Sequence, residues 1–408
     1  MSHATADPLD LALEHGDLAQ ACDMADRALA GVADRFDYLL SVSPVNTQEA
    51  MHRWLDGGAD GTPDFLYRDV GFDVSSLRKE LHQIELTHLH EPLVEGLLLE
   101  KRRELDKQLE LIEQRCTSEF RATSEELYGA VSEPLLEAAR AILERVKYAP
   151  CRVQRVGAEE LREHAAMLVE TYREEDAEFA PVIEIRDDVT GLLVSYPKLM
   201  IDAGASVSVR RVDPLLSHEL SIHMVTGFNG AHQPLSLFAS GLAGYEEIQE
   251  GLGVFAEWAV GGLYASRLRL IAARVVSVHC MLEGADFTEC HRELVHHCGV
   301  GQRTAFKICA RVHRGGGFAK DAIYLRGFFR VMDYIADGGE LSPYWVGKIA
   351  PVHVPIIKEL EARGLAVPAR LTPEFLSRED AKARIADYVD DPSPDKWLSP
   401  EPDHESAA

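Results

Sequence analysis

The sequence has no long hydrophobic run, few cysteines and a shortage of basic residues. No stretch approaches the ~18 consecutive apolar residues that a transmembrane helix requires, so we expect no membrane-spanning segment. The opening residues, MSHATADPLDLALEHGD, carry neither the basic segment nor the apolar core of a signal peptide. The seven cysteines are odd in number and scattered, which is typical of reduced thiols. These absences predict a soluble cytoplasmic protein.

The charge balance is strongly acidic. Lys and Arg number 42 against 67 Asp and Glu, which gives a formal net charge of −25. Because such a surface repels phosphate backbones and anionic lipids, we expect neither nucleic acid nor membrane partners. A local basic pocket is compatible with this balance, whereas a broad basic face is not.

Helical periodicity dominates the chain. Apolar residues recur at helical spacing over residues 9–41, from about 74 to 146, and again from 213 to about 338. Segments between 179 and 212 are rich in β-branched residues and predict short strands. We therefore predict an α+β, mostly helical fold with a small sheet. The predicted divisions are an N-terminal helical extension (1–60), a helical scaffold (61–150), a core that carries the site (151–388) and a disordered acidic tail (389–408).

Two histidines and a glutamate follow the last predicted strand, in the run His218-Glu219-Leu220-Ser221-Ile222-His223. Zinc peptidases hold one metal with two neutral imidazoles and use an adjacent carboxylate as base. The usual helical motif spaces its histidines by four residues, which places them on one face. Here they are five apart, and a regular helix separates them by roughly 140°. A π-type turn would reunite His218 and His223; the alternative is a solvated helix face.

A second source of carboxylates follows in the run Gly244-Tyr245-Glu246-Glu247-Ile248-Gln249-Glu250-Gly251-Leu252. Two histidines and a glutamate from a later helix form a known catalytic zinc set with one position open for water. Glu247 and Glu250 lie three residues apart on one face, so either can supply the third ligand. The alternative for Glu246 and Glu247 is a favourable interaction with the positive helix N-terminus.

These runs resemble a known family. The segments HELSIHMVTGFNGAHQPLSLFASGLAGYEEIQEGL, RLRLIAARVV and RVHRGGGFAKDAIYLRG resemble the bacterial proteins named for a QEGLA motif and for modulating flavohaemoglobin expression. Those proteins are related to the eukaryotic microtubule-associated tyrosine carboxypeptidases. The resemblance covers about residues 60–375 and implies a zincin-like metallopeptidase core with an HExxxH zinc site.

The resemblance also implies residue roles. By motif position the zinc ligands are His218, His223 and Glu250, and the general base is Glu219. The sequence departs from the family at Ser221-Ile222, where the family has Gly-Thr, and at Gly253, where QEGLA ends in alanine. Neither change removes a ligand. The carboxypeptidase activity belongs to the eukaryotic relatives, so its transfer to this chain is an analogy of chemistry.

The glycine-rich segment Arg311-Val312-His313-Arg314-Gly315-Gly316-Gly317-Phe318-Ala319-Lys320-Asp321 precedes Tyr324. A carboxypeptidase needs a cation for the terminal carboxylate and a donor for the developing oxyanion. Arg314 and Lys320 are candidates for the cation, and Tyr324 is a candidate for the donor. The alternative is a glycine turn with ordinary surface charges. Arg210 and Arg211 are further candidates for the cation.

Other histidines and cysteines do not match a known site. Cys290-His291 and His296-His297-Cys298 have the composition of a metal cluster, but their spacing fits no common zinc site. The leading hypothesis is a zinc metallopeptidase that hydrolyses at or near the C-terminus of a peptide or protein tail. The alternatives are a non-catalytic regulatory or binding protein on the same fold and a zinc amidohydrolase for a small molecule.

Overall fold

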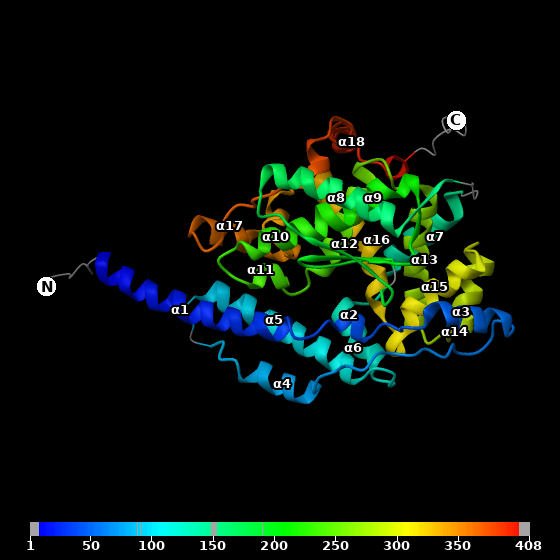
Figure 1. The fold of residues 1–408 in the computed structure, drawn as a ribbon, viewed down its shortest axis with the longest axis horizontal. Helices are drawn as coiled ribbons and strands as arrows, with labels where there is room; N and C mark the ends of the chain where they lie inside the picture. Colours follow the sequence, from blue (N-terminus) through cyan, green and yellow to red (C-terminus); the bar gives the residue numbers. More distant parts are fainter. Residues whose placement is uncertain (1–7, 88, 90, 148–152, 190, 400–408) are drawn as a thin grey trace.

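The structure is a computed structural model and describes residues 8–87, 89, 91–147, 153–189 and 191–399, with side chains from residue 20 onward. Helices dominate and the strands are short (Figure 1), which confirms the prediction of an α+β, mostly helical chain with a small sheet. The zincin-like core stays a prediction. Within the described ranges, no helix is both long enough and apolar enough to cross a bilayer.

The first part of the chain is helical, as the periodicity predicted. Its helices are α1 (Pro8–Ala33), α2 (Tyr38–Ser41), α3 (Thr47–Asp56), α4 (Val74–Gln83), α5 (Pro92–Glu113), α6 (Phe120–Tyr128) and α7 (Glu133–Arg145). Asp73 opens α4, because its carboxylate accepts a hydrogen bond from the Ser76 amide at 3.3 Å. Pro92 opens α5, where no amide donor is needed. Helices α1, α4 and α5 lie side by side toward the end from which the N-terminus emerges (Figure 1).

Two small sheets follow. The strands are β1 (Arg155–Gly157), β2 (Val182–Arg186), β3 (Leu192–Ser195), β4 (Lys198–Asp202) and β5 (Ser206–Ser208). β1 pairs antiparallel with β5, while β4 lies between parallel β2 and antiparallel β3. Helix α8 (Ala158–Glu175) packs on β2 and β4. The strands predicted between 179 and 212 are confirmed, and β1 was not predicted.

The rest of the chain returns to helices. They are α9 (Val212–Leu216), α10 (Val225–Ala231), α11 (Leu237–Ser240), α12 (Glu246–Ala259), α13 (Ala265–Leu282), α14 (Phe287–Arg292), α15 (Gln302–His313), α16 (Ile323–Ala336), α17 (Val354–Ala362) and α18 (Glu379–Asp390). Helices α12 and α16 pack along each other at the centre of the molecule (Figure 1). Gly251 and Gly327 allow this approach, since a Cβ on Gly251 would lie 2.3 Å from the Gly327 carbonyl carbon.

Two apolar cores meet at the segment that carries the HExxxH run. Ile222 belongs to the larger core, which helices α1–α7 and α11–α18 form, and Leu220 belongs to a smaller core that the three-stranded sheet, α8, α9 and α10 form. Both side chains are fully buried. Because Leu220 and Ile222 pack into different cores, the segment is fixed in its rotation about its own axis. This rotation sets the direction in which its histidines point.

The N-terminal extension packs onto the later helices. Both carboxylate oxygens of Asp26 accept hydrogen bonds from backbone amides at the start of α11, Ser236 at 2.5 Å and Leu237 at 2.8 Å. The ring of Tyr38 lies 6.1 Å from the ring of Phe318, in the glycine-rich segment. The extension therefore completes the core next to that segment.

The C-terminal end differs from the disordered tail that was predicted from residue 389. Helix α18 continues to Asp390, and a short 3₁₀ turn follows at Pro394–Trp397. The Trp397 ring stacks on Phe329 at 4.8 Å, and the Lys396 carbonyl accepts a hydrogen bond from the indole of Trp258 at 2.8 Å. The segment around Lys396 and Trp397 is thus packed against α12 and α16, and residues 400–408 lie outside the described range.

Candidate metal centre

The HExxxH segment forms a π-helix, η2 (Ser217–Met224), between α9 and α10. Its wider turn returns side chains five residues apart to the same face. The ring centroids of His218 and His223 are therefore 4.9 Å apart. The π-type turn that the five-residue spacing required is confirmed, and the solvated-face alternative is wrong because His218 is 4 % exposed.

Glu250 of α12 completes a triad with the two histidines. Its Oε2 lies 3.5 Å from His218 Nε2 and 3.8 Å from His223 Nε2, and one ligand atom from each residue lies within 4.8 Å of the others. Glu247, the alternative ligand, is held elsewhere by ion pairs with Arg326 at 2.6 Å and Arg330 at 2.8 Å. The structure therefore groups His218, His223 and Glu250 as residues that can hold a metal ion.

The donor set and its spacing fit a zinc ion. Zinc binds imidazole nitrogen and carboxylate oxygen at about 2.0–2.2 Å with tetrahedral angles, which places neighbouring ligand atoms roughly 3.3–3.6 Å apart. The two distances to Glu250 Oε2 are close to this range. Three protein ligands leave the fourth position open for water or substrate, as in catalytic rather than structural zinc sites.

Hydrogen bonds behind the triad orient the imidazoles. His218 Nδ1 lies 2.9 Å from Glu257 Oε1, and His223 Nδ1 lies 3.3 Å from Gln249 Oε1. Because both partner oxygens only accept, each Nδ1 carries a proton, which leaves Nε2 of each ring as the atom that can bind a metal. Glu257 is fully buried, and Arg211 and Arg267 donate to it at 2.8–2.9 Å.

The electrostatics of the site follow from burial and these contacts. Burial raises the pKa of Glu219 to about 7, against the opposing charge of His218. Burial lowers the pKa of His223 to about 4, which keeps its imidazole neutral and able to bind metal. Burial opposes protonation of His218 too, but hydrogen bonds to Glu250 and Glu257 raise its pKa to about 10. A metal must displace that proton to bind.

The three residues expected to contact substrate have different partners, and Lys320 is the one that pairs with Glu250. Lys320 is buried, and its ammonium pairs with Glu246 at 2.9 Å and with Glu250 at 3.3 Å. Tyr324 on α16 lies beneath the guanidinium of Arg274, 4.9 Å from its ring centroid. Arg314 is buried, donates to Ser43 Oγ at 2.7 Å and lies 4.5 Å from the ring centroid of Phe318.

Sequence reasoning missed Glu257 as a partner of His218. Glu257 follows Glu250 by seven residues, two turns along one face of α12, and this spacing is a signal that was present. Arg211 was considered only as a cation for substrate, and the structure pairs it with Glu257. Arg267 and Gln249 carry no sequence signal, because their partners come from other elements.

Other clusters lie away from the triad. Among the residues that the structure describes, no other group of three His, Cys, Asp or Glu side chains is close enough to hold a metal. His291 Nε2 instead lies 3.0 Å from the Gln302 carbonyl, and Cys290 is buried. His82 is exposed and pairs with Asp106 at 3.2 Å, while His88 and His90 lie outside the described residues.

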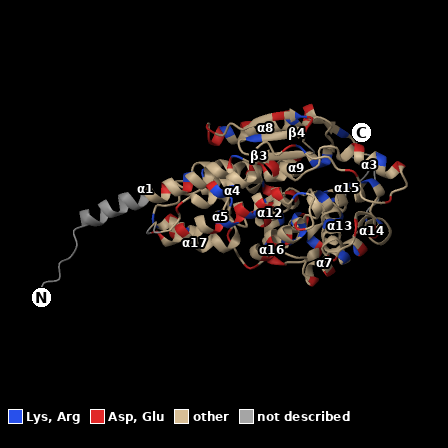
Figure 2. Cartoon of the chain, turned by 90° about the horizontal axis from the view of Figure 1, so that it is seen from below, with Lys and Arg blue, Asp and Glu red and all other residues tan. Residues whose placement is uncertain are grey.

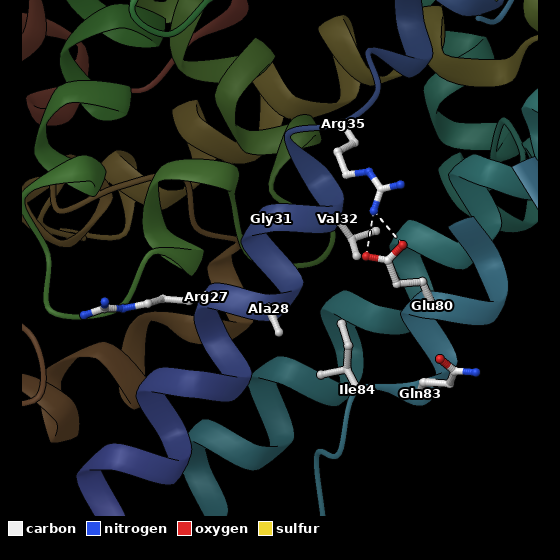
Figure 3. Close-up of a pocket in the computed structure, with 8 residues that line it drawn as sticks. All are labelled: Arg27, Ala28, Gly31, Val32, Arg35, Glu80, Gln83 and Ile84. Carbon is white, nitrogen blue, oxygen red and sulfur yellow. Dashed lines mark hydrogen bonds and ion pairs between the residues drawn. The ribbon is translucent and has the colours of Figure 1, made fainter. Parts of the chain in front are cut away.

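A pocket of about 450 Å³ lies between α1 and α4 (Figure 3). Its polar lining includes Arg35, whose Nη1 donates to both oxygens of Glu80. None of the candidate site residues lines it, and its charged pair is already satisfied. Acidic residues are distributed over most of the helices, interspersed with Lys and Arg (Figure 2).

Comparisons with known proteins give one informative match. A solved structure of a lipoprotein of unknown function from Shewanella oneidensis is 13% identical to this chain. The match covers 78% of this chain and 73% of that chain, and its TM-score of 0.38 is too low to assign a shared fold. No curated protein matches the chain. The sequence model of a family described as microtubule-associated tyrosine carboxypeptidase, MATCAP, matches residues 52–391. The chain belongs to the microtubule-associated tyrosine carboxypeptidase family.

Proposed function

We propose that the chain is a zinc-dependent carboxypeptidase that hydrolyses at the C-terminus of a peptide or protein tail in the cytoplasm. The observation that carries this proposal is the triad of His218, His223 and Glu250, with Glu219 between the two histidines. Membership of a family described as carboxypeptidases supports the same reaction class. The free cysteines among the described residues are consistent with a reducing compartment.

In this proposal His218, His223 and Glu250 hold the zinc, which when bound polarises the scissile carbonyl and acidifies the attacking water. Glu219 accepts a proton from that water and passes it to the leaving amine. Burial raises the pKa of Glu219, which makes its carboxylate a stronger proton acceptor than an exposed glutamate.

The substrate side of the proposal uses Tyr324, Arg314 and Lys320. Tyr324 donates a hydrogen bond to the carbonyl oxygen as negative charge develops on it. Arg314 and Lys320 supply positive charge toward the terminal carboxylate, and Lys320 also pairs with Glu250. A free carboxylate is preferred over an amide at the substrate C-terminus for this reason.

The first experiment compares three variants by elemental analysis and peptide hydrolysis. We expect about one zinc per chain in the wild type and in Glu219→Gln, and loss of zinc in His218→Ala. Glu219→Gln keeps the ligands, so its hydrolysis of a C-terminal peptide library should fall by about 10²–10⁴-fold.

His82→Ala is the matched control, since it removes an exposed histidine and leaves the triad intact. Folded wild-type protein that takes up no added zinc would contradict the enzyme assignment and favour a regulatory or binding protein. Full zinc occupancy with hydrolysis of a small amide but of no peptide would favour the amidohydrolase alternative.

A further inference from the structure

Four cysteines lie around the last turns of α13, outside the metal centre. Cys280 belongs to α13, Cys290 to α14 and Cys309 to α15, and Cys298 directly follows the π-helical turn η3 (Glu293–His297). In the part of the chain that the structure describes, none of them belongs to a group of three side chains that could hold a metal ion. Their chemistry is therefore that of thiols.

The contacts of Ser277 show how closely the sulfur atoms approach α13. Its carbonyl oxygen lies 4.0 Å from Cys290 Sγ, and its hydroxyl oxygen lies 4.0 Å from Cys309 Sγ. Cys280 is one turn further along α13, and its thiol shares a hydrogen bond with the Cys290 thiol. The Ala285 amide donates to the Cys280 carbonyl at 2.9 Å, and the Ala285 carbonyl lies 3.9 Å from Cys290 Sγ. Two free thiols are thus held in contact by the turn between α13 and α14.

The two thiols of this pair differ in exposure and in charge. Cys280 is partly exposed, whereas Cys290 is fully buried. The hydrogen bond from Cys290 lowers the pKa of Cys280, and Arg140 acts in the same direction, while burial and Glu293 oppose them. The same hydrogen bond and burial raise the pKa of Cys290. Since the thiolate is the nucleophilic form of cysteine, Cys280 is the thiol of the pair that reacts with a small molecule from solvent.

The other two cysteines of the group lack these properties. Cys298 and Cys309 are buried, and burial raises the pKa of Cys298 to about 11 and that of Cys309 to about 12. Buried thiols that stay protonated at neutral pH are inert toward oxidants. The reactive pair within the group is therefore Cys280 and Cys290.

We propose that Cys280 and Cys290 form a redox site that hydrogen peroxide converts reversibly into a disulfide. The Cys280 thiolate attacks one peroxide oxygen, the O–O bond breaks and hydroxide leaves, so that the sulfur becomes a sulfenic acid. The Cys290 sulfur then attacks the Cys280 sulfur. The S–S bond forms as the S–O bond breaks, and the hydroxyl group leaves with the thiol proton as water. The two thiols lose two electrons, peroxide gains them, and a small dithiol reverses the reaction.

The buried partner limits how far oxidation of Cys280 proceeds. A sulfenic acid without a thiol partner is oxidised further to sulfinic and sulfonic acids, which a dithiol does not reduce. Because the two thiols are already in contact, Cys290 captures the sulfenic acid in a reducible form. The pair thereby protects α13, whose other end places Arg267 against Glu257 behind His218. This role does not depend on the hydrolysis proposed above.

Mass spectrometry of the full-length chain tests the proposal. The protein is treated with hydrogen peroxide, alkylated and digested with trypsin. Because no Lys or Arg lies between Arg274 and Arg292, both thiols fall in one peptide, residues 275–292. We expect this peptide to become two hydrogens lighter, to escape alkylation and to recover both thiols after treatment with dithiothreitol. A bond from Cys280 to Cys298 would instead join it to the peptide of residues 293–303, and that product overturns the proposed pair.

Cys290→Ser removes the resolving thiol, so its Cys280 should accumulate sulfinic and sulfonic acid about 10-fold more than in wild type. Cys116→Ser is the matched control, since it removes an exposed thiol outside the group and should leave the disulfide unchanged. Two results overturn the proposal. One is full alkylation of the wild-type peptide at a peroxide concentration that oxidises Cys116, and this result needs no variant to fold. The other is equal over-oxidation of Cys280 with and without Cys290. Neither readout uses zinc content or hydrolysis, so failure of the proposed function leaves this test unaffected.

Discussion

At the scale of single residues, Gly253 determines where the His218 ring can lie. A Cβ on Gly253 would fall 2.4–2.5 Å from the atoms of that imidazole, closer than side chains approach. The ring cannot move away freely, because it is buried and hydrogen-bonded to Glu257. The glycine that replaces the motif alanine thus makes room for a metal ligand in this chain.

We therefore predict that Gly253→Ala weakens zinc binding. The added methyl group displaces His218 from the position that Glu257 sets, and disturbed ligand orientation lowers metal affinity by about 10–100-fold. Competition with a chromogenic chelator measures the effect. Gly31→Ala is the control, because no atom lies within 4 Å of its Cβ. Unchanged affinity in Gly253→Ala would show that the ring shifts without cost and that Gly253 is not required.

At the scale of elements, the sequence predicted the unusual turn but not its surroundings. The five-residue spacing of His218 and His223 has one helical solution that unites them, so the π-helix could be derived from local geometry. The pairing of Glu257 with Arg211 and Arg267 could not, because those contacts join three elements. The composition of the C-terminal segment also predicted disorder from residue 389. The prolines and acidic residues favour that prediction, but the Trp397 ring packs on Phe329.

The crossing of α12 and α16 sets the distance between Glu250 and Tyr324, and it depends on Gly327. A Cβ there would lie 2.1 Å from the Glu247 carbonyl oxygen. We predict that Gly327→Ala lowers the free energy of unfolding by about 1–3 kcal/mol or more, as overpacking does. Gly96→Ala, in the exposed interior of α5, should instead raise it by about 0.5–1 kcal/mol.

Urea unfolding of the two glycine variants separates these effects. Hydrolysis should fall in Gly327→Ala beyond any loss of folded protein, since the helices that carry Glu250 and Tyr324 separate. A Gly327→Ala variant as stable as wild type would contradict the close crossing, and normal hydrolysis in a destabilised variant would show that the site tolerates the separation.

At the scale of the whole molecule, buried ionised carboxylates make stability depend on pH. Burial alone would raise the pKa of Glu257 and of Asp321, yet the arginines around each carboxylate lower both below the usual range. In the unfolded chain these groups take up protons near pH 4, whereas in the folded chain they do so only at lower pH. Their stabilisation is therefore complete above about pH 5 and is lost as the pH falls below 4.

His313 adds a second acid-sensitive group at higher pH. Burial lowers its pKa from 6.5 to about 4, and its Nε2 has no hydrogen-bond partner among the described residues. Between these two values the unfolded chain binds the proton and the folded chain does not, so stability falls as the pH drops from about 6.5 to 4. The loss attributable to His313 is on the order of 1–3 kcal/mol.

The prediction is that His313→Phe flattens this part of the pH profile. Phenylalanine suits the site, because the His313 ring already packs against Phe287 at a centroid distance of 5.5 Å. Urea unfolding is measured from pH 7 to 4 with chelator present in both proteins, so that protonation of the zinc ligands does not contribute through metal loss. The variant should lose less stability than wild type between pH 6.5 and 4, and both should lose it below pH 4 through Glu257 and Asp321. Parallel profiles would mean that His313 is protonated in the folded chain, and the acid response would then belong to other groups, among them His223, Glu257 and Asp321.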